Sequence, residues 1–114
     1  DDTLFGANND DKMYGFGGNN TIYGGEGNNW IFAGNGNNNL YAGAGNDYFN
    51  AGNGNNTFYA GEGNNSVFAG NGNNVVYTGA GNDFISLGNG NNLIYSGEGN
   101  NTITSSGIDT IYTG

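Results

Sequence analysis

The stretch GNGNNTFYAGEGNNSVFAGNGNNVVYTGAGNDF, residues 52–84, contains one motif that recurs every nine residues. Each copy reads Gly-x-Gly-Asn, continues with Asn or Asp, and ends in a short run of apolar and aromatic residues. A fixed period of this kind indicates a repeat architecture, in which each unit buries its apolar side chain against the next unit. The fold therefore follows from the unit and from how its copies stack.

The same register extends over nearly all 114 residues when the two glycines are numbered positions 2 and 4 of the unit. Position 8 is apolar in every unit, from Leu4 through Phe58 to Ile111. Positions 7 and 9 on either side of it are rich in Thr, Tyr and Phe, so each unit predicts a three-residue strand whose central side chain points inward. Positions 1 to 6 predict a turn, in which glycine permits positive φ and close approach of neighbouring backbones.

Composition excludes several classes of function. One Lys faces ten acidic residues, for a net charge of -9, so there is no basic surface for nucleic acid. No apolar run approaches the ~18 residues needed to cross a bilayer, so membrane insertion is not expected. With no His and no Cys, and with Lys12 alone, the chain offers no acid–base or nucleophilic constellation, and we expect a non-enzymatic protein. Residues 1–114 are expected to form a single domain.

The repeated pattern G-x-G-N-[N/D]-x-U-x, where U is a large apolar residue, resembles the RTX (repeats-in-toxin) nonapeptide G-G-x-G-x-D-x-U-x over essentially the whole chain. The resemblance implies an all-β fold, a right-handed parallel β-roll or β-solenoid with two nonapeptides (18 residues) per coil. The chain would then make about six coils and be near 30 Å long. It also implies calcium bound between successive turns, held by the position-6 Asp and by backbone carbonyls of the glycine-rich turns. This chain departs from the family pattern at position 6, which is Asn in most units.

An eighteen-residue winding would place the interior acidic residues on one edge of the roll, called edge one here. Position 6 on this edge alternates Asp with Asn, while position 3 alternates Glu with Ala in the opposite phase. Because calcium prefers oxygen ligands, these acids form the predicted metal site. Its residues are Asp11, Glu26, Asp47, Glu62, Asp83 and Glu98. A second interpretation needs no metal: the alternation separates like charges that would otherwise stack ~4.8 Å apart.

The opposite edge, called edge two, carries Asn at positions 3 and 6 and has no carboxylate between Asp2 and Asp109. Stacked Asn side chains both donate and accept hydrogen bonds, so they can form a ladder along the roll without an ion. Position 9 places a second column on one face of the roll. This column holds Tyr23, Tyr41, Tyr59, Tyr77 and Tyr95. We expect these rings to pack on one another, and an aromatic surface also permits contact with a partner or a second copy.

Two functions follow as hypotheses. The first is a calcium-binding RTX-like structural module of a secreted or cell-surface protein, which folds or assembles when Ca²⁺ binds along the acidic edge. The second is a metal-independent Asn-ladder solenoid that serves as a filament or adhesin spacer. Copies of such a spacer would stack head to tail through the solenoid ends, and the tyrosine face is a second surface for self-association.

Overall fold

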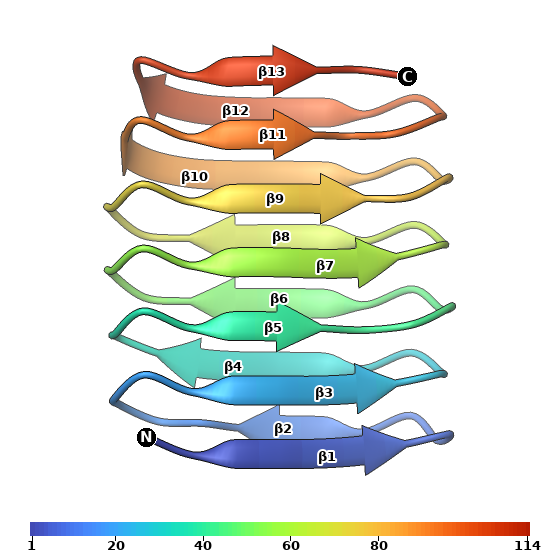
Figure 1. Cartoon of the computed structure of the whole chain (residues 1–114). Helices are drawn as coiled ribbons and strands as arrows, with labels where there is room; N and C mark the ends of the chain where they lie inside the picture. The colour runs from blue at the N-terminus through green and yellow to red at the C-terminus, as the bar shows by residue number, and fades with distance from the viewer.

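The computed structural model describes all of residues 1–114 and contains thirteen β-strands and no helix. The strands alternate between two parallel sheets (Figure 1). The first sheet holds β1 (Thr3–Ala7), β3 (Thr21–Gly25), β5 (Asn39–Tyr41), β7 (Thr57–Gly61), β9 (Val75–Thr78), β11 (Leu93–Tyr95) and β13 (Thr110–Tyr112). The second sheet holds β2 (Lys12–Tyr14), β4 (Trp30–Gly34), β6 (Tyr48–Ala51), β8 (Ser66–Ala69), β10 (Phe84–Gly90) and β12 (Thr102–Gly107).

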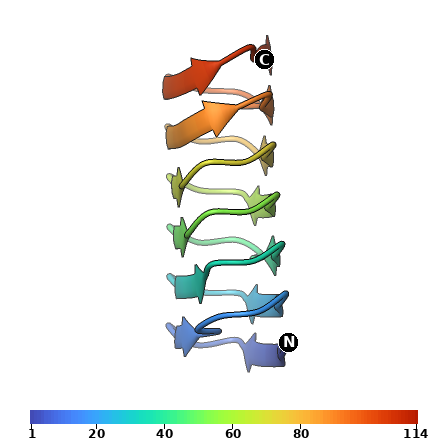
Figure 2. The same cartoon turned by 90° about the vertical axis from the view of Figure 1, so that its left-hand side faces the viewer.

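Each strand pairs with the strand two places further along the chain, so one coil contains two repeats. Tyr23 pairs with Tyr41, and Ile31 pairs with Phe49, which is an offset of eighteen residues in each sheet. The chain rises from one end of the molecule to the other as a right-handed coil (Figure 1), and the two sheets face each other as thin layers (Figure 2). The molecule measures 33 × 29 × 12 Å. The predicted all-β, right-handed parallel solenoid of about six coils is confirmed.

The position-8 side chains of the two sheets face each other and form most of the core, as the sequence predicts. Phe49 and Phe58, from opposite sheets, meet edge to face with their ring centroids 6.0 Å apart. Small position-1 side chains such as Ala33 and Ala60 are also buried, and they belong to the same apolar cluster as the position-8 side chains. Because only the strand interiors are apolar, the turns at the two edges must be stabilised by polar groups.

The turn glycines meet a steric requirement that arises from coil stacking. Gly54, at position 4, has φ of 134°, and a Cβ there would collide with the carbonyl oxygen of Gly36 in the coil below. The first two turns depart from the glycine rule at position 2. There Ala7 has φ of 104° and Phe16 has φ of 60°, a region that side chains disfavour.

Relief of this strain gives a first prediction. Ala7→Gly is expected to raise the free energy of unfolding by about 1 kcal/mol, because glycine adopts the positive φ without a steric penalty. Urea denaturation followed by far-UV circular dichroism measures the change. Ala42→Gly is the matched control. Ala42 has no positive φ and packs against the core, so this variant is expected to lose stability. Equal effects of the two variants would contradict the strain argument.

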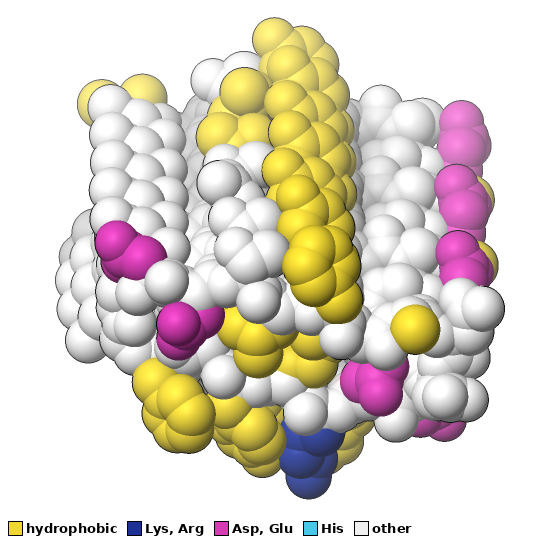
Figure 3. Space-filling view, turned by 60° about the horizontal axis from the view of Figure 1, so that its bottom comes forward, with side chains coloured by type: hydrophobic (Ala, Val, Ile, Leu, Met, Phe, Trp, Pro, Cys, Tyr) yellow, Lys and Arg dark blue, Asp and Glu magenta, His cyan; other side chains and the backbone are white.

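Aromatic side chains cover both outer faces. On the first sheet, Phe5, the five position-9 tyrosines and Tyr112 form one stacked column, with neighbouring centroids 4.8–5.0 Å apart. An unbroken apolar column is visible along this face in Figure 3. On the second sheet the rings are tilted around Tyr48, and the Lys12 ammonium lies 5.0 Å from the ring centroid of Trp30. The predicted packing of the tyrosines on one another is therefore observed.

Candidate metal centre at the edges of the solenoid

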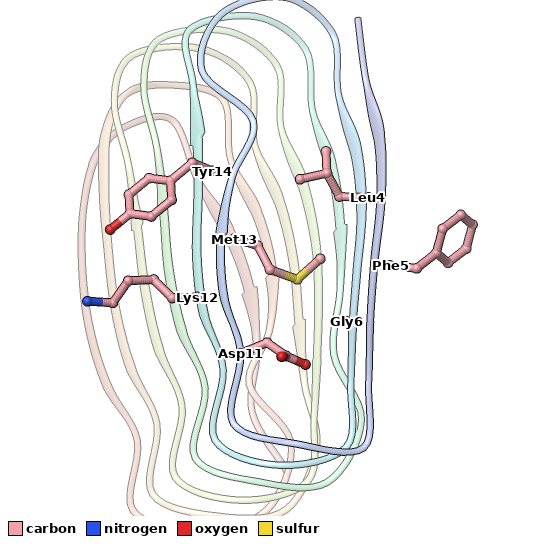
Figure 4. Close-up of a pocket in the computed structure, with 7 residues that line it drawn as sticks. All are labelled: Leu4, Phe5, Gly6, Asp11, Lys12, Met13 and Tyr14. Atoms are coloured by element: carbon pink, nitrogen blue, oxygen red, sulfur yellow. The ribbon is translucent and has the colours of Figure 1, made fainter.

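The position-6 side chains turn into the wall of the solenoid on both edges. All of them are buried between Asn20 and Asn92. The view along the coil axis shows this orientation for Asp11, whose carboxylate points inward while Lys12 and Tyr14 point away (Figure 4). Asp11 lines an opening at the first coil together with Leu4, Phe5, Gly6, Lys12, Met13 and Tyr14. Position 6 is thus the polar counterpart of position 8, and it fills the space that the glycine-rich turn encloses.

Every buried position-6 Asn has both ends of its amide bonded. Asn65 shows the pattern: its Oδ1 accepts the backbone N–H of Asp47 in the coil below, at 2.9 Å. Its Nδ2 donates to the carbonyls of Gly61 and Gly63 in its own turn, at 3.2 and 3.1 Å. The backbone N–H can only donate, so it fixes Oδ1 on that side, and the NH₂ group must face the two carbonyls.

The interior Asp turns on edge one, at Asp47 and Asp83, keep the first of these bonds and lose the second. Asp47 Oδ1 accepts the backbone N–H of Asn29 at 2.8 Å. Its other oxygen, Oδ2, is buried without a hydrogen-bond partner, as are the Oδ2 atoms of Asp11 and Asp83. By the geometry of the Asn turns, this second oxygen lies on the side of the two turn carbonyls. An ionised Asp therefore brings an oxygen where an Asn brings two N–H donors, and the turn lacks positive charge.

The electrostatics of Asp47 reflect this environment. Burial raises the pKa of Asp47 to about 6, although hydrogen bonds from Asn29 work in the opposite direction. The charges of Glu26 and Asp10 raise the pKa further. Asp109 provides the contrast: burial favours its neutral form, but hydrogen bonds from Asn92 and Ser105 outweigh this and lower its pKa. Asp109 is also much less buried than Asp47, so depth and hydrogen-bond donors together separate the two carboxylates.

The three position-3 glutamates lie on the same edge but outside the wall. Glu26 Oε2 accepts the backbone N–H of Ala44 in the coil above at 3.0 Å, and Glu62 does the same for Ala80. Acidic side chains appear along this edge in Figure 3. The structure thus brings the six predicted site residues to edge one, with the aspartates facing inward and the glutamates exposed. No three acidic side chains gather into one cluster.

An outer Asn ladder at position 5 was not predicted from the sequence, whereas stacking of the position-3 Asn side chains on edge two was. At position 5, each side-chain oxygen accepts the backbone N–H of the residue eighteen places later, as Asn46 does for Asn64 at 2.8 Å. Position 3 of edge two follows the same rule, with Asn53 accepting from Asn71 at 2.8 Å. The nearly invariant Asn at position 5 was the available signal. On edge two, inner amides also bond directly along the column, as from Asn38 Nδ2 to Asn56 Oδ1 at 3.0 Å.

Comparison with known families identifies the repeat. The family model described as the RTX calcium-binding nonapeptide repeat (4 copies) matches residues 1–31, 14–49, 23–58, 32–67, 50–85 and 68–103. The chain belongs to this RTX calcium-binding repeat family. No curated protein and no solved structure matched the chain. In addition, no helix is long and apolar enough to cross a membrane.

The two kinds of turn in this RTX solenoid differ in how they suit the calcium that the family binds. An Asp turn offers a free carboxylate oxygen and turn carbonyls, which are the hard oxygen ligands that calcium prefers. At Asp11, Asp47 and Asp83 the buried oxygen without a partner fits such a cation. An Asn turn does not fit, because its NH₂ group already donates to the same carbonyls. When bound, calcium would supply the positive charge that the Asp turns lack.

Proposed function

We propose that the chain is a non-enzymatic, calcium-binding structural module of a secreted or cell-surface protein, the setting typical of RTX repeats. Calcium at the Asp turns of edge one would stabilise the wound solenoid and neutralise part of its acidic charge. The observation that carries the proposal is the buried, unpartnered Oδ2 of Asp11, Asp47 and Asp83. A buried charge with no partner is costly, so a bound cation would stabilise the fold at these turns.

The two groups of acids would have different roles. Asp47 would be a direct ligand together with the carbonyls of its turn, and Asp11 and Asp83 would act likewise. Glu26 would act through its charge, since it already raises the pKa of Asp47 while its own Oε2 accepts a backbone N–H. Ligand charge tunes calcium affinity, and one direct carboxylate per site predicts weak binding, with Kd of about 10⁻⁴–10⁻³ M as in extracellular modules.

Isothermal titration calorimetry with CaCl₂ tests the proposal. The Asp11→Asn, Asp47→Asn, Asp83→Asn triple variant is expected to lose the binding heat that the wild type shows. Each new amide would donate to the carbonyls of its turn, as Asn65 does, and would leave no carboxylate for calcium. The matched control is the triple variant Glu26→Gln, Glu62→Gln, Glu98→Gln, which removes the same formal charge from the outer surface of the same edge. It is expected to weaken binding only a few-fold. Absence of binding by the wild type, or equal binding by the Asp triple variant, would contradict the proposed site.

A metal-independent structural spacer is the second candidate function. It is favoured by the Asn turns, whose buried amides are satisfied without any ion, as Asn56 shows in its bonds to Gly52, Gly54 and Asn74. In this case the solenoid ends or the exposed tyrosine column would mediate self-association of copies into a filament or adhesin stalk. A wild-type chain that shows no calcium heat in the same titration would favour this function over the first.

A further inference from the structure

We infer that the amide of each position-6 Asn takes the place of a cation in its own turn, so that these turns exclude calcium and the chain winds without it. The inference depends on the proposed function only for the Asp turns, which remain the places where calcium acts. It differs from the sequence-based expectation that calcium drives folding of the whole roll. Three features of the structure support it: the bonds of the amide, the ligands left for a cation, and the order of the turns along the chain.

The amide is held at both ends in every Asn turn. The Nδ2 donor bonds found for Asn65 recur with the same partners, the carbonyls two and four residues earlier, at Asn29, Asn38, Asn56 and Asn74. Near the ends of the solenoid, Asn20, Asn92 and Asn101 also donate to turn carbonyls. The backbone N–H of the coil below keeps Oδ1 out of the turn, so the side chain cannot flip to offer its oxygen inward.

An Asn turn leaves few oxygen ligands free for a cation. Calcium takes six to eight oxygen ligands and no amide nitrogen. In the turn of Asn74, Nδ2 lies within hydrogen-bond distance of the carbonyls of Gly70 and Gly72, at 3.4 and 3.0 Å, and of Asn92 Oδ1, at 3.1 Å. The side-chain oxygen is bound to the backbone N–H of Asn56. A cation entering this turn would have to displace the NH₂ group without gaining a charged ligand. The two amide hydrogens thus provide the positive end that the carbonyls require.

Turns that are complete without metal occur throughout the solenoid. On edge two, Asn turns follow one another without interruption from Asn20 to Asn92. On edge one, each interior Asp turn lies between two Asn turns, as Asp47 does between Asn29 and Asn65. Every interior coil therefore contains at least one turn that is complete without metal. The stability of a repeat protein is close to a sum of the stabilities of its units and of the interfaces between neighbours. The Asn turns, which we call closed, therefore hold the Asp turns, which we call open, in register.

The first experiment uses the wild-type chain in EDTA. Its far-UV circular dichroism spectrum is expected to show the same β-structure as in calcium, and its urea unfolding is expected to remain cooperative. A chain that is unfolded in EDTA and β-rich in calcium would overturn the inference while leaving the proposed calcium function intact. A chain that is folded in EDTA but binds no calcium would overturn the proposed function and support the inference. The two failures are therefore distinguishable.

The second experiment converts one closed turn into an open one. Asn74→Asp replaces a buried amide, whereas the control Asn73→Asp adds the same charge at the neighbouring exposed position. In EDTA at neutral pH, Asn74→Asp is expected to lower the urea midpoint by roughly 2 M, and calcium is expected to restore most of the loss. Asn73→Asp should change little in either condition. An Asn74→Asp chain as stable as the wild type in EDTA would overturn the inference.

Stoichiometry provides a readout that does not depend on folding of the variant. The wild type is expected to bind no more calcium ions than it has turns with a buried, unpartnered Asp Oδ2, at Asp11, Asp47 and Asp83. Equilibrium dialysis with calcium measures this number directly. Binding of an additional ion for each Asn turn would show that the amides do not exclude the cation, and it would overturn the inference even if both variants behaved as expected.

Discussion

Asp47→Asn is expected to raise the free energy of unfolding by about 3 kcal/mol in a calcium chelator at pH 7.5. The wild-type carboxylate is buried, and its Oδ2 has no partner. The new amide keeps the bond from the backbone N–H of Asn29 and can donate to the carbonyls of Gly43 and Gly45, as Asn65 does to Gly61 and Gly63. A substitution that removes an ionisable group at a family metal position is thus expected to stabilise the metal-free chain.

The pH dependence of this gain follows from the pKa of Asp47, which rises from its ordinary value of 3.8 to about 6 in the folded chain. An acid with a raised pKa binds its proton more tightly when folded, so its contribution to stability is fully present below 3.8. The contribution is lost as pH rises through about 6. The advantage of Asp47→Asn should therefore be small near pH 4 and reach its full size above pH 6.

Urea unfolding of both proteins across this pH range, in EDTA, measures the difference. Asp109→Asn is the matched control, because hydrogen bonds already lower the pKa of Asp109 and the same substitution there should give no stabilisation. Calcium should narrow the gap between wild type and Asp47→Asn, since only the wild type retains the ligand. A gain that is equal at pH 4 and pH 7.5 would show that it does not arise from the buried charge.

The coiled architecture could be predicted from the sequence because the apolar position and the glycine positions recur with the same nine-residue period. A position-8 side chain such as Phe58 must be apolar, and a position-4 glycine such as Gly54 must leave room for the backbone of the coil below. The sequence of each unit therefore shows which residue points inward and where the turn lies. The two-unit coil came from the family resemblance, and the pairing of Tyr23 with Tyr41 confirms it. The distribution of acids between the two edges followed from that winding alone.

The direction of the edge side chains was not accessible in the same way. Asp47 and Glu26 both fall on edge one, and spacing alone treats them as equivalent oxygen ligands. The structure separates them because the backbone at position 6 turns the side chain inward, while position 3 lies on the outside of the turn. Nor does spacing show which end of an Asn amide faces inward. That choice is made by a backbone N–H in another coil, so it depends on three-dimensional stacking.

Removal of one inner amide should have a large effect even far from any acidic residue. Asn56→Ala is expected to lower the free energy of unfolding by about 4 kcal/mol, since several buried polar groups lose their partners at once. The backbone N–H of Asn38 loses the oxygen that it donates to, and the carbonyls of Gly52 and Gly54 lose the amide hydrogens. A loss of this size is a large part of the ~5–15 kcal/mol that stabilises a typical domain.

Asn55→Ala is the control, because it removes the same atoms from the outer ladder one residue away. The oxygen of Asn55 accepts the backbone N–H of Asn73 at 2.8 Å, but this bond is exposed, and water can replace it at a cost below ~1 kcal/mol. Urea unfolding in EDTA and in calcium should give the same difference between the two variants, since the turn that holds both residues contains no Asp. A similar loss in both variants would mean that the inner and outer ladders contribute equally. In that case burial of the amide would not be what closes the turn.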